Sequence, residues 1–231
     1  MDGKPMVARV ALVNRILHEL DERHIVVVRG SRMTGKSSVA TAISHVLQKM
    51  YAGNAKLHIF HFALAQWEIN DTFEASFEEK FRVSWYHAAK VLPRSGYIVY
   101  LVVDDALVVD CEEKSLSPSL GNYAFWSVVR RLIPNLRVLL VVGDGSTLRS
   151  ISYVSPVDLT RNVVDNKDLK FAHDEIREYV FKCFRGIGNL EVSEAIDMDT
   201  SRWFLVFCDH LEWLTGGHVG LCVATIDTLN K

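Results

Sequence analysis

The chain has 231 residues, of which 49% are hydrophobic and 23% charged, and this suits one large domain or a core domain with a small appendage. Its net charge of −2 and pI of about 6.5 argue against a general nucleic-acid or membrane-surface binder. Four cysteines follow no zinc-binding spacing, and no apolar run approaches the ~20 residues that cross a bilayer. We therefore expect free thiols, no membrane span, no secretion signal and an intracellular protein.

The first elements alternate between helical and extended patterns. Helical spacing and apolar runs predict helices over residues 6–22, 36–43 and 73–92, and strands over 24–29 and 57–64. The third of these helices is expected to end near the proline at position 93, because proline removes a backbone donor.

Two strongly apolar runs follow, at residues 97–105 and 136–142. Continuous apolar runs indicate strands that are buried on both faces, as in a parallel sheet covered by helices. Between them, residues 110–121 predict a surface loop and 123–132 a helix. This alternation predicts an α/β fold with a three-layer parallel sheet.

The last third of the chain has a helical pattern. Residues 174–184, 200–214 and 218–229 predict helices, with no further long apolar strand. We expect two domains, a core over residues 1–160 and a small helical subdomain over 161–231.

Residues 30–37, Gly-Ser-Arg-Met-Thr-Gly-Lys-Ser, match the phosphate-binding loop of nucleoside triphosphatases, G-x-x-x-x-G-K-[ST]. The match lies between a predicted strand and a predicted helix, as this loop requires. Gly30 and Gly35 are expected to take backbone angles that side chains forbid, so that loop N–H groups cradle phosphate oxygens. Lys36 can reach the β- and γ-phosphates, and the Ser37 hydroxyl can bind Mg²⁺.

The loop and the helix start supply the predicted nucleotide contacts. These residues are Gly30, Ser31, Arg32, Met33, Thr34, Gly35, Lys36, Ser37 and Ser38. Ser38 is expected near the α-phosphate, whereas the side chains of Arg32 and Met33 are expected to face solvent. The expected ligands are ATP or GTP and Mg²⁺.

The strand over residues 97–105 ends in two carboxylates, at the sheet edge where α/β proteins bind ligands. Asp104 is predicted to hold Mg²⁺. Asp105 is either the residue that orients the attacking water or a cap for the following turn. One predicted strand–helix unit separates Lys36 from Asp104, as in the P-loop class that has an extra strand inserted between the loop and this carboxylate.

Two further polar segments are candidates for the site. Residues 143–146 follow a buried strand, and Ser146, with Asp144 as the second candidate, contacts the γ-phosphate or belongs to an ordinary turn. Two glycines separate the last two predicted helices. His218 beside them contacts the nucleotide base or belongs to a simple helix–helix corner.

Several further motifs indicate which group of P-loop proteins the chain resembles. Besides the loop, the chain contains Leu-Val-Val-Asp-Asp-Ala, Leu-Lys-Phe-Ala-His-Asp-Glu-Ile and Leu-Thr-Gly-Gly-His-Val-Gly-Leu. In these motifs it resembles the P-loop ATPase domain of the Crinkler effectors of oomycetes and fungi. It is also similar to the trypanosome retrotransposon-hot-spot proteins and to archaeal-type ATPases of the signal-transduction (STAND) group within the AAA+ relatives. The resemblance covers residues 10–228, nearly the whole chain.

The resemblance implies a nucleotide-binding core with a helical lid. For hydrolysis, the candidate catalytic residues are Lys36, Asp105 and Ser146. The resemblance also implies delivery into the cytoplasm or nucleus of a host cell, although the chain has no visible delivery header or nuclease-like domain. Asp105 stands where the family usually has glutamate, and Val219 where many relatives have proline.

Two functions stay open on the sequence. One is slow Mg²⁺-dependent ATP hydrolysis, and the other is a nucleotide-gated binding switch with little turnover, which aspartate at position 105 favours. Expected partners are the nucleotide and either a second copy of the chain or another protein, of the host or of the same organism. Nucleic acid is not expected to bind this domain alone.

Overall fold

The computed structural model describes residues 6–63, 73–106, 125, 128, 133–143, 162–185 and 202–229. The chain divides into two compact units. The unit that we call the sheet unit comprises Ala11–Ser31 and Lys36–Asp165. The helical unit comprises Met1–Val10, Arg32–Gly35 and Asn166–Lys231. The predicted phosphate-binding loop is therefore divided, with its tip in the helical unit and its ends in the sheet unit.

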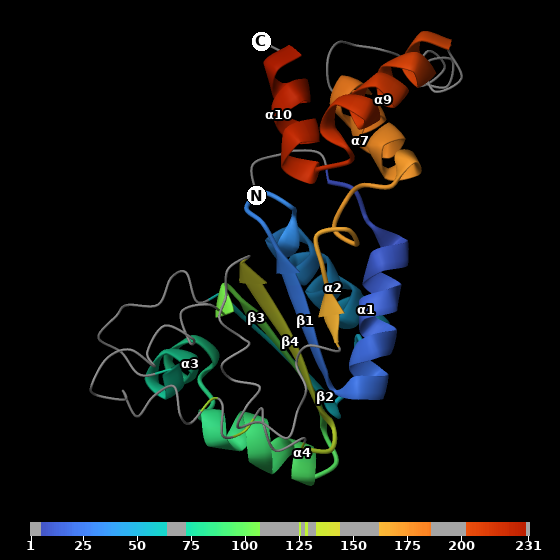
Figure 1. Cartoon of the computed structure of the whole chain (residues 1–231). Helices are drawn as coiled ribbons and strands as arrows, with labels where there is room; N and C mark the ends of the chain where they lie inside the picture. The colour runs from blue at the N-terminus through green and yellow to red at the C-terminus, as the bar shows by residue number, and fades with distance from the viewer. Residues whose placement is uncertain are drawn as a thin grey trace, which may run out of the picture. The chain divides into compact units, whose positions relative to one another are not determined.

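The sheet unit contains a five-stranded parallel sheet (Figure 1). Across the sheet the strands are β2 (Leu57–Ala63), β3 (Ile98–Asp104), β4 (Leu136–Gly143), β1 (Ile25–Gly30) and β5 (Val163–Val164). A strand separates β1 from β3, as predicted for the P-loop class. In the chain the strand between them is β2, whereas in the sheet it is β4.

One face of the sheet carries an aromatic core. It is covered by α3 (Phe73–Phe81) and by the short π-helical turn η2 (His87–Val91), which leads into α4 (Leu92–Arg94). Phe73 packs against Trp85 and Phe125 with ring centroids 5.0 Å and 4.9 Å away. Alternate residues of β3 and β4 complete this core, because successive side chains of a strand point to opposite faces.

The opposite face carries α1 (Val10–Arg23) and α2 (Lys36–Met50). Helix α2 contacts four strands, β1 to β4. The Tyr100 hydroxyl of β3 donates a hydrogen bond to Asp21 of α1 at 2.8 Å. Asp104 lies on this face as well, since it follows Tyr100 by four positions in the strand and side chains an even number of positions apart share a face. Helices on both faces of a parallel sheet make the predicted three-layer α/β fold.

The helix predicted over residues 73–92 is interrupted. Helix α3 ends at Phe81, Arg82 takes a left-handed φ of 57°, and helical structure resumes at Trp85. The Ser84 hydroxyl accepts the His87 N–H at 3.3 Å and caps the second segment. This segment ends at Arg94, directly after Pro93, so the helix ends near the proline as predicted. The wider π-helical turn directly before it gives the proline ring room that a regular α-helix lacks.

The helical unit contains the three predicted C-terminal helices. They are α7 (His173–Arg185), α9 (Arg202–Thr215) and α10 (Val219–Leu229). Their common core includes the side chains of Cys208 and Cys222, both fully buried, as expected from their apolar surroundings in the sequence. Within the described part of the chain, no helix is both long and apolar enough to span a bilayer.

Candidate functional site

The ends of the predicted phosphate-binding loop lie between β1 and α2 in the sheet unit. Gly30 is the last residue of β1 and pairs with Gly143 of β4. Lys36 begins α2, and its amine donates a hydrogen bond to the Ser31 carbonyl at 2.5 Å. Ser37 follows in the first turn of α2 with an exposed side chain, and so does the next serine. The predicted order of strand, loop and helix is confirmed.

The loop backbone differs from the prediction at one glycine. Gly35 takes a left-handed φ of 81°, but Gly30 has no positive φ and continues the strand. The other left-handed residue of the loop is Met33, with a φ of 62°. A side chain rarely adopts this conformation, which costs roughly 1–2 kcal/mol. The packing around Met33 must therefore stabilise it.

Two carboxylates stand where β3 ends. Asp104 is only 6% exposed, and its Oδ1 accepts the Asp105 N–H at 3.0 Å. Asp105 has a left-handed φ of 54°, which aspartate tolerates better than most residues. Partial burial raises the pKa of Asp105 and the neighbouring Asp104 charge raises it further, whereas Lys36 lowers it. The lysine and the two carboxylates therefore act on one another at the carboxyl edge of the sheet.

The tip of the loop, Arg32–Gly35, packs on the first turn of α10 within the helical unit. The side chains of Arg32 and Met33 are exposed. A Cβ built on Gly35 would lie 3.5 Å from Val219 Cγ1, an ordinary contact distance. A Cβ built on Gly220 would lie 2.5 Å from Met33 Cβ, which is closer than two carbon atoms can approach.

His218 caps α10. Its Nδ1 accepts the Leu221 N–H at 3.3 Å, so that a neutral imidazole carries its proton on Nε2. The His218 N–H donates to the Thr215 carbonyl at 3.1 Å. These bonds serve the corner between α9 and α10, as in the simpler of the two alternatives for this residue. Contact between His218 and a nucleotide base stays a prediction.

Arg9 is a buried charge that the sequence analysis did not single out. It is 6% exposed and forms an ion pair with Glu175 at 3.4 Å. Its guanidinium donates to the carbonyls of Lys170 at 2.7 Å and Asp168 at 3.4 Å, and lies 5.4 Å from the Phe171 ring centre. The available signal was a single charged residue in an otherwise apolar segment. Arg9 ties this N-terminal segment to the residues that lead into α7.

Two predicted site residues lie outside the described residues. Ser146 and Asp144 belong to the segment after β4, of which only Gly143 is described. Their contact with a γ-phosphate therefore stays a prediction.

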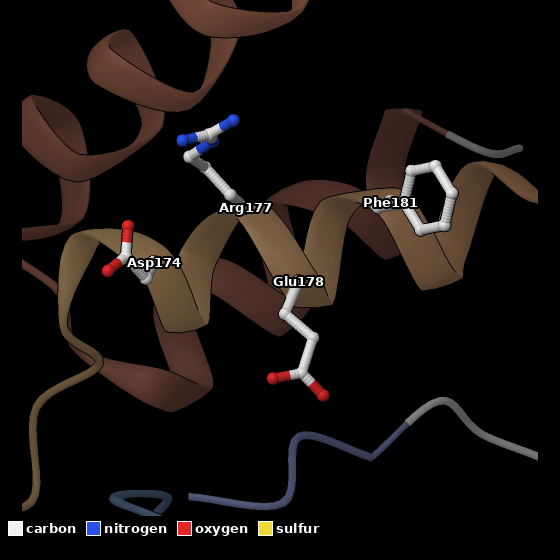
Figure 2. A pocket seen from close by; sticks show the side chains of 4 residues that line it. All are labelled: Asp174, Arg177, Glu178 and Phe181. Carbon is white, nitrogen blue, oxygen red and sulfur yellow. The ribbon is translucent and has the colours of Figure 1, made fainter. Parts of the chain in front are cut away.

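A shallow pocket of about 350 Å³ lies on α7, away from all predicted site residues in sequence. Figure 2 shows the four side chains that line it, Asp174, Arg177, Glu178 and Phe181. All four lie on α7 at helical spacing, and Arg177 lies between Asp174 and Glu178 in the sequence. Among the described residues, no group of three or more His, Cys, Asp or Glu side chains could hold a metal ion.

No family model matches the chain, and no curated protein matches it. Solved structures are similar in fold. The ORC2 protein of Aeropyrum pernix, solved as ADPNP–ADP complexes, aligns with 99% of this chain at a TM-score of 0.55 and 14% identity. Its ADP form aligns with 96% of the chain at a TM-score of 0.52 and 12% identity.

A third similar structure is Drosophila ORC bound to DNA, which aligns with 98% of this chain at a TM-score of 0.51 and 14% identity. In each of these three comparisons the chain spans 62% of the other chain. At this level of identity the likeness concerns the fold alone. Together with the sheet order and the loop motif, it shows that the chain has the fold of a P-loop ATPase core.

Proposed function

We propose that the chain binds ATP or GTP together with Mg²⁺ and hydrolyses the nucleotide slowly at the γ-phosphate. The observation that carries this proposal is the grouping of Lys36, Asp104 and Asp105 in the sheet unit. Lys36 starts the helix after β1, and the carboxylates end β3. Parallel strands bring these positions to one edge of the sheet, which is where α/β proteins bind ligands.

The side chains fit a magnesium ion. Ser37 offers a hydroxyl and Asp104 a carboxylate, and Mg²⁺ prefers hard oxygen ligands. Asp104 is almost fully buried on the face that carries α2, and the backbone N–H of Asp105 occupies only one of its acceptor positions. A bound Mg²⁺ would neutralise negative charge on the phosphates.

The residues of the chain supply the remaining chemistry. The Lys36 ammonium stabilises charge on the β- and γ-phosphates, and the first N–H groups of α2 add their partial positive charge. Asp105 orients a water for attack on the γ-phosphorus, and the bond to the bridging oxygen breaks to release the diphosphate. The raised pKa of Asp105 makes its carboxylate a better proton acceptor than a freely solvated aspartate.

Calorimetric titration with ATP and GTP, with Mg²⁺ or with EDTA, tests the binding proposal. We expect Lys36→Ala to abolish binding, because Lys36 is the only cationic residue in the Gly-Lys-Ser sequence that ends the motif. Lys49→Ala is a matched control, since Lys49 is exposed in the last turn of the same helix. Wild-type affinity in Lys36→Ala would show that the site is wrongly assigned.

A nucleotide-gated switch with little turnover is the second candidate function. Asp105 favours it, because aspartate is one methylene shorter than the glutamate of the resembled family and holds a water less well. Single-turnover hydrolysis separates the two functions. Phosphate release that is lost in Asp105→Ala supports the enzyme, whereas tight binding of ATP without release supports the switch.

The wider biological role rests on the family motifs alone. We propose that the chain is the NTPase domain of a Crinkler-like effector, with a nucleotide-binding core over residues 1–160 and a helical lid over 161–231. Ser146 and His218 would contact the γ-phosphate and the base. The protein partner would be a second copy or another protein.

Two experiments test this wider role. Size-exclusion chromatography in ATP and in ADP tests whether two copies of the chain associate in a nucleotide-dependent way. A fluorescent fusion expressed in a host cell tests for nuclear accumulation.

A further inference from the structure

The first turn of α10 approaches the phosphate-binding loop more closely than a side chain at position 220 allows. A Cβ built on Gly220 would lie 2.5 Å from Met33 Cβ and 2.8 Å from the Met33 carbonyl oxygen. It would also lie 3.3 Å from Met33 Cε. The first two distances are far inside van der Waals contact, whereas the third is only tight. The packing of the loop on α10 therefore requires a residue without a side chain at position 220.

The loop residue on the other side of this contact is conformationally unusual. Met33 holds a left-handed φ of 62° although it has a side chain. Gly35, two residues later, has a φ of 81°, and Val219 lies against it. Two consecutive residues of α10 thus pack on the two left-handed residues of the loop. The direction of the loop N–H groups depends on these two backbone conformations.

The start of α10 is itself fixed by the corner that precedes it. The Gly217 carbonyl accepts the Phe171 N–H at 2.8 Å, and a Cβ on Gly217 would lie 2.7 Å from the Phe171 carbonyl oxygen. The Thr215 hydroxyl accepts the Gly217 N–H at 3.3 Å, and His218 caps the helix. The first turn of α10 is therefore held by several hydrogen bonds, so we expect the loop to be the part that yields to an added side chain.

We propose that Gly220 is a positioning residue for the phosphate-binding loop. By leaving bare backbone at the start of α10, it lets Met33 keep its left-handed conformation and so keeps the loop N–H groups turned toward a phosphate. This inference rests on the proposed nucleotide binding. The sign of its effect is distinctive, because alanine in place of glycine normally stabilises a helix, whereas at position 220 it would disturb the loop.

Four variants test the proposal: Gly220→Ala, Met33→Gly, the double variant and the control Leu221→Ala, whose side chain is 52% exposed on the same helix. Two measurements are made on each, amide hydrogen exchange of residues 32–36 without nucleotide and calorimetric affinity for ATP. For Gly220→Ala we expect faster loop exchange and an affinity lower by about tenfold or more. Met33→Gly removes two of the three close atoms, and the backbone freedom of glycine lets the carbonyl at position 33 move aside. The double variant should therefore recover most of the affinity. Leu221→Ala should match the wild type.

Unchanged ATP affinity in Gly220→Ala would overturn the proposal. If the wild-type chain binds no nucleotide, the proposed function fails, and loop exchange then decides the contact alone: faster exchange in Gly220→Ala supports it and equal exchange overturns it. If Gly220→Ala does not fold, the double variant decides. Folding restored by Met33→Gly supports the contact. Failure of both variants overturns it, because a glycine at position 33 has no Cβ and can turn its carbonyl away from position 220.

Discussion

Replacing Arg9 by methionine tests whether one buried arginine holds the N-terminal segment in place. The guanidinium gives two hydrogen bonds to the carbonyls of Lys170 and Asp168 and pairs with Glu175, all while only 6% exposed. Each hydrogen bond from a charged donor contributes about 1.5–3 kcal/mol. Methionine keeps apolar contact with the Phe171 ring and avoids the desolvation of a charge, which offsets part of the loss.

The expected net loss in the free energy of unfolding is about 3 kcal/mol, within the range for breaking a buried pair. It corresponds to a fall in melting temperature of roughly 6–12 °C for a chain of this size. Urea unfolding followed by far-ultraviolet circular dichroism measures it. The loss should persist in 0.5 M NaCl, because salt screens exposed ion pairs far more than buried ones.

Arg94→Met is the matched control, since Arg94 is exposed at the end of α4. We expect it to change the free energy of unfolding by less than about 0.5 kcal/mol. A loss below about 1 kcal/mol in Arg9→Met would refute the reasoning, because it would mean that the hydrogen bonds to Arg9 are replaced without cost.

Three further changes test the packing and the electrostatics. Burial and the guanidinium of Arg137 lower the pKa of His24, so its neutral form stabilises the fold above pH ~6.5 and this contribution is lost as the pH falls. His24→Asn, which tolerates the φ of 64° at this position, should therefore reduce the fall in urea midpoint between about pH 7 and pH 5. Gly217→Ala should cost about 2–4 kcal/mol in urea unfolding, because its φ is left-handed and the new Cβ would meet the Phe171 carbonyl; a cost under 1 kcal/mol would contradict this. Phe77→Ala, at a fully buried core position, should lower the free energy of unfolding by about 3–5 kcal/mol and leave the slope of that free energy against urea concentration unchanged. A loss near zero, as expected for an exposed residue, would contradict the aromatic core.

Local patterns were enough to predict most elements and part of the site. The strands β1, β3 and β4 are continuous apolar runs because both of their faces are covered, so burial is visible in the residues themselves. The loop motif is equally local, since its function requires certain residues at consecutive positions. The helical pattern of residues 73–92 was misleading in one respect. Hydrophobic spacing continues across the break at Arg82, and the left-handed turn there carries no glycine to signal it.

Contacts between distant residues were beyond such patterns. The sheet order is set by pairing between strands, and β4 separates β1 from β3 although it follows both in the chain. The two-residue strand β5 exists only through its pairing with β1. Likewise, Arg9 and Lys170 are 161 positions apart in the chain. Position 220 has no room for a side chain only because Met33 packs against it. Residue type and spacing indicate the secondary structure of a segment and which of its faces are buried. Which distant segment meets it depends on how the whole chain fills its interior.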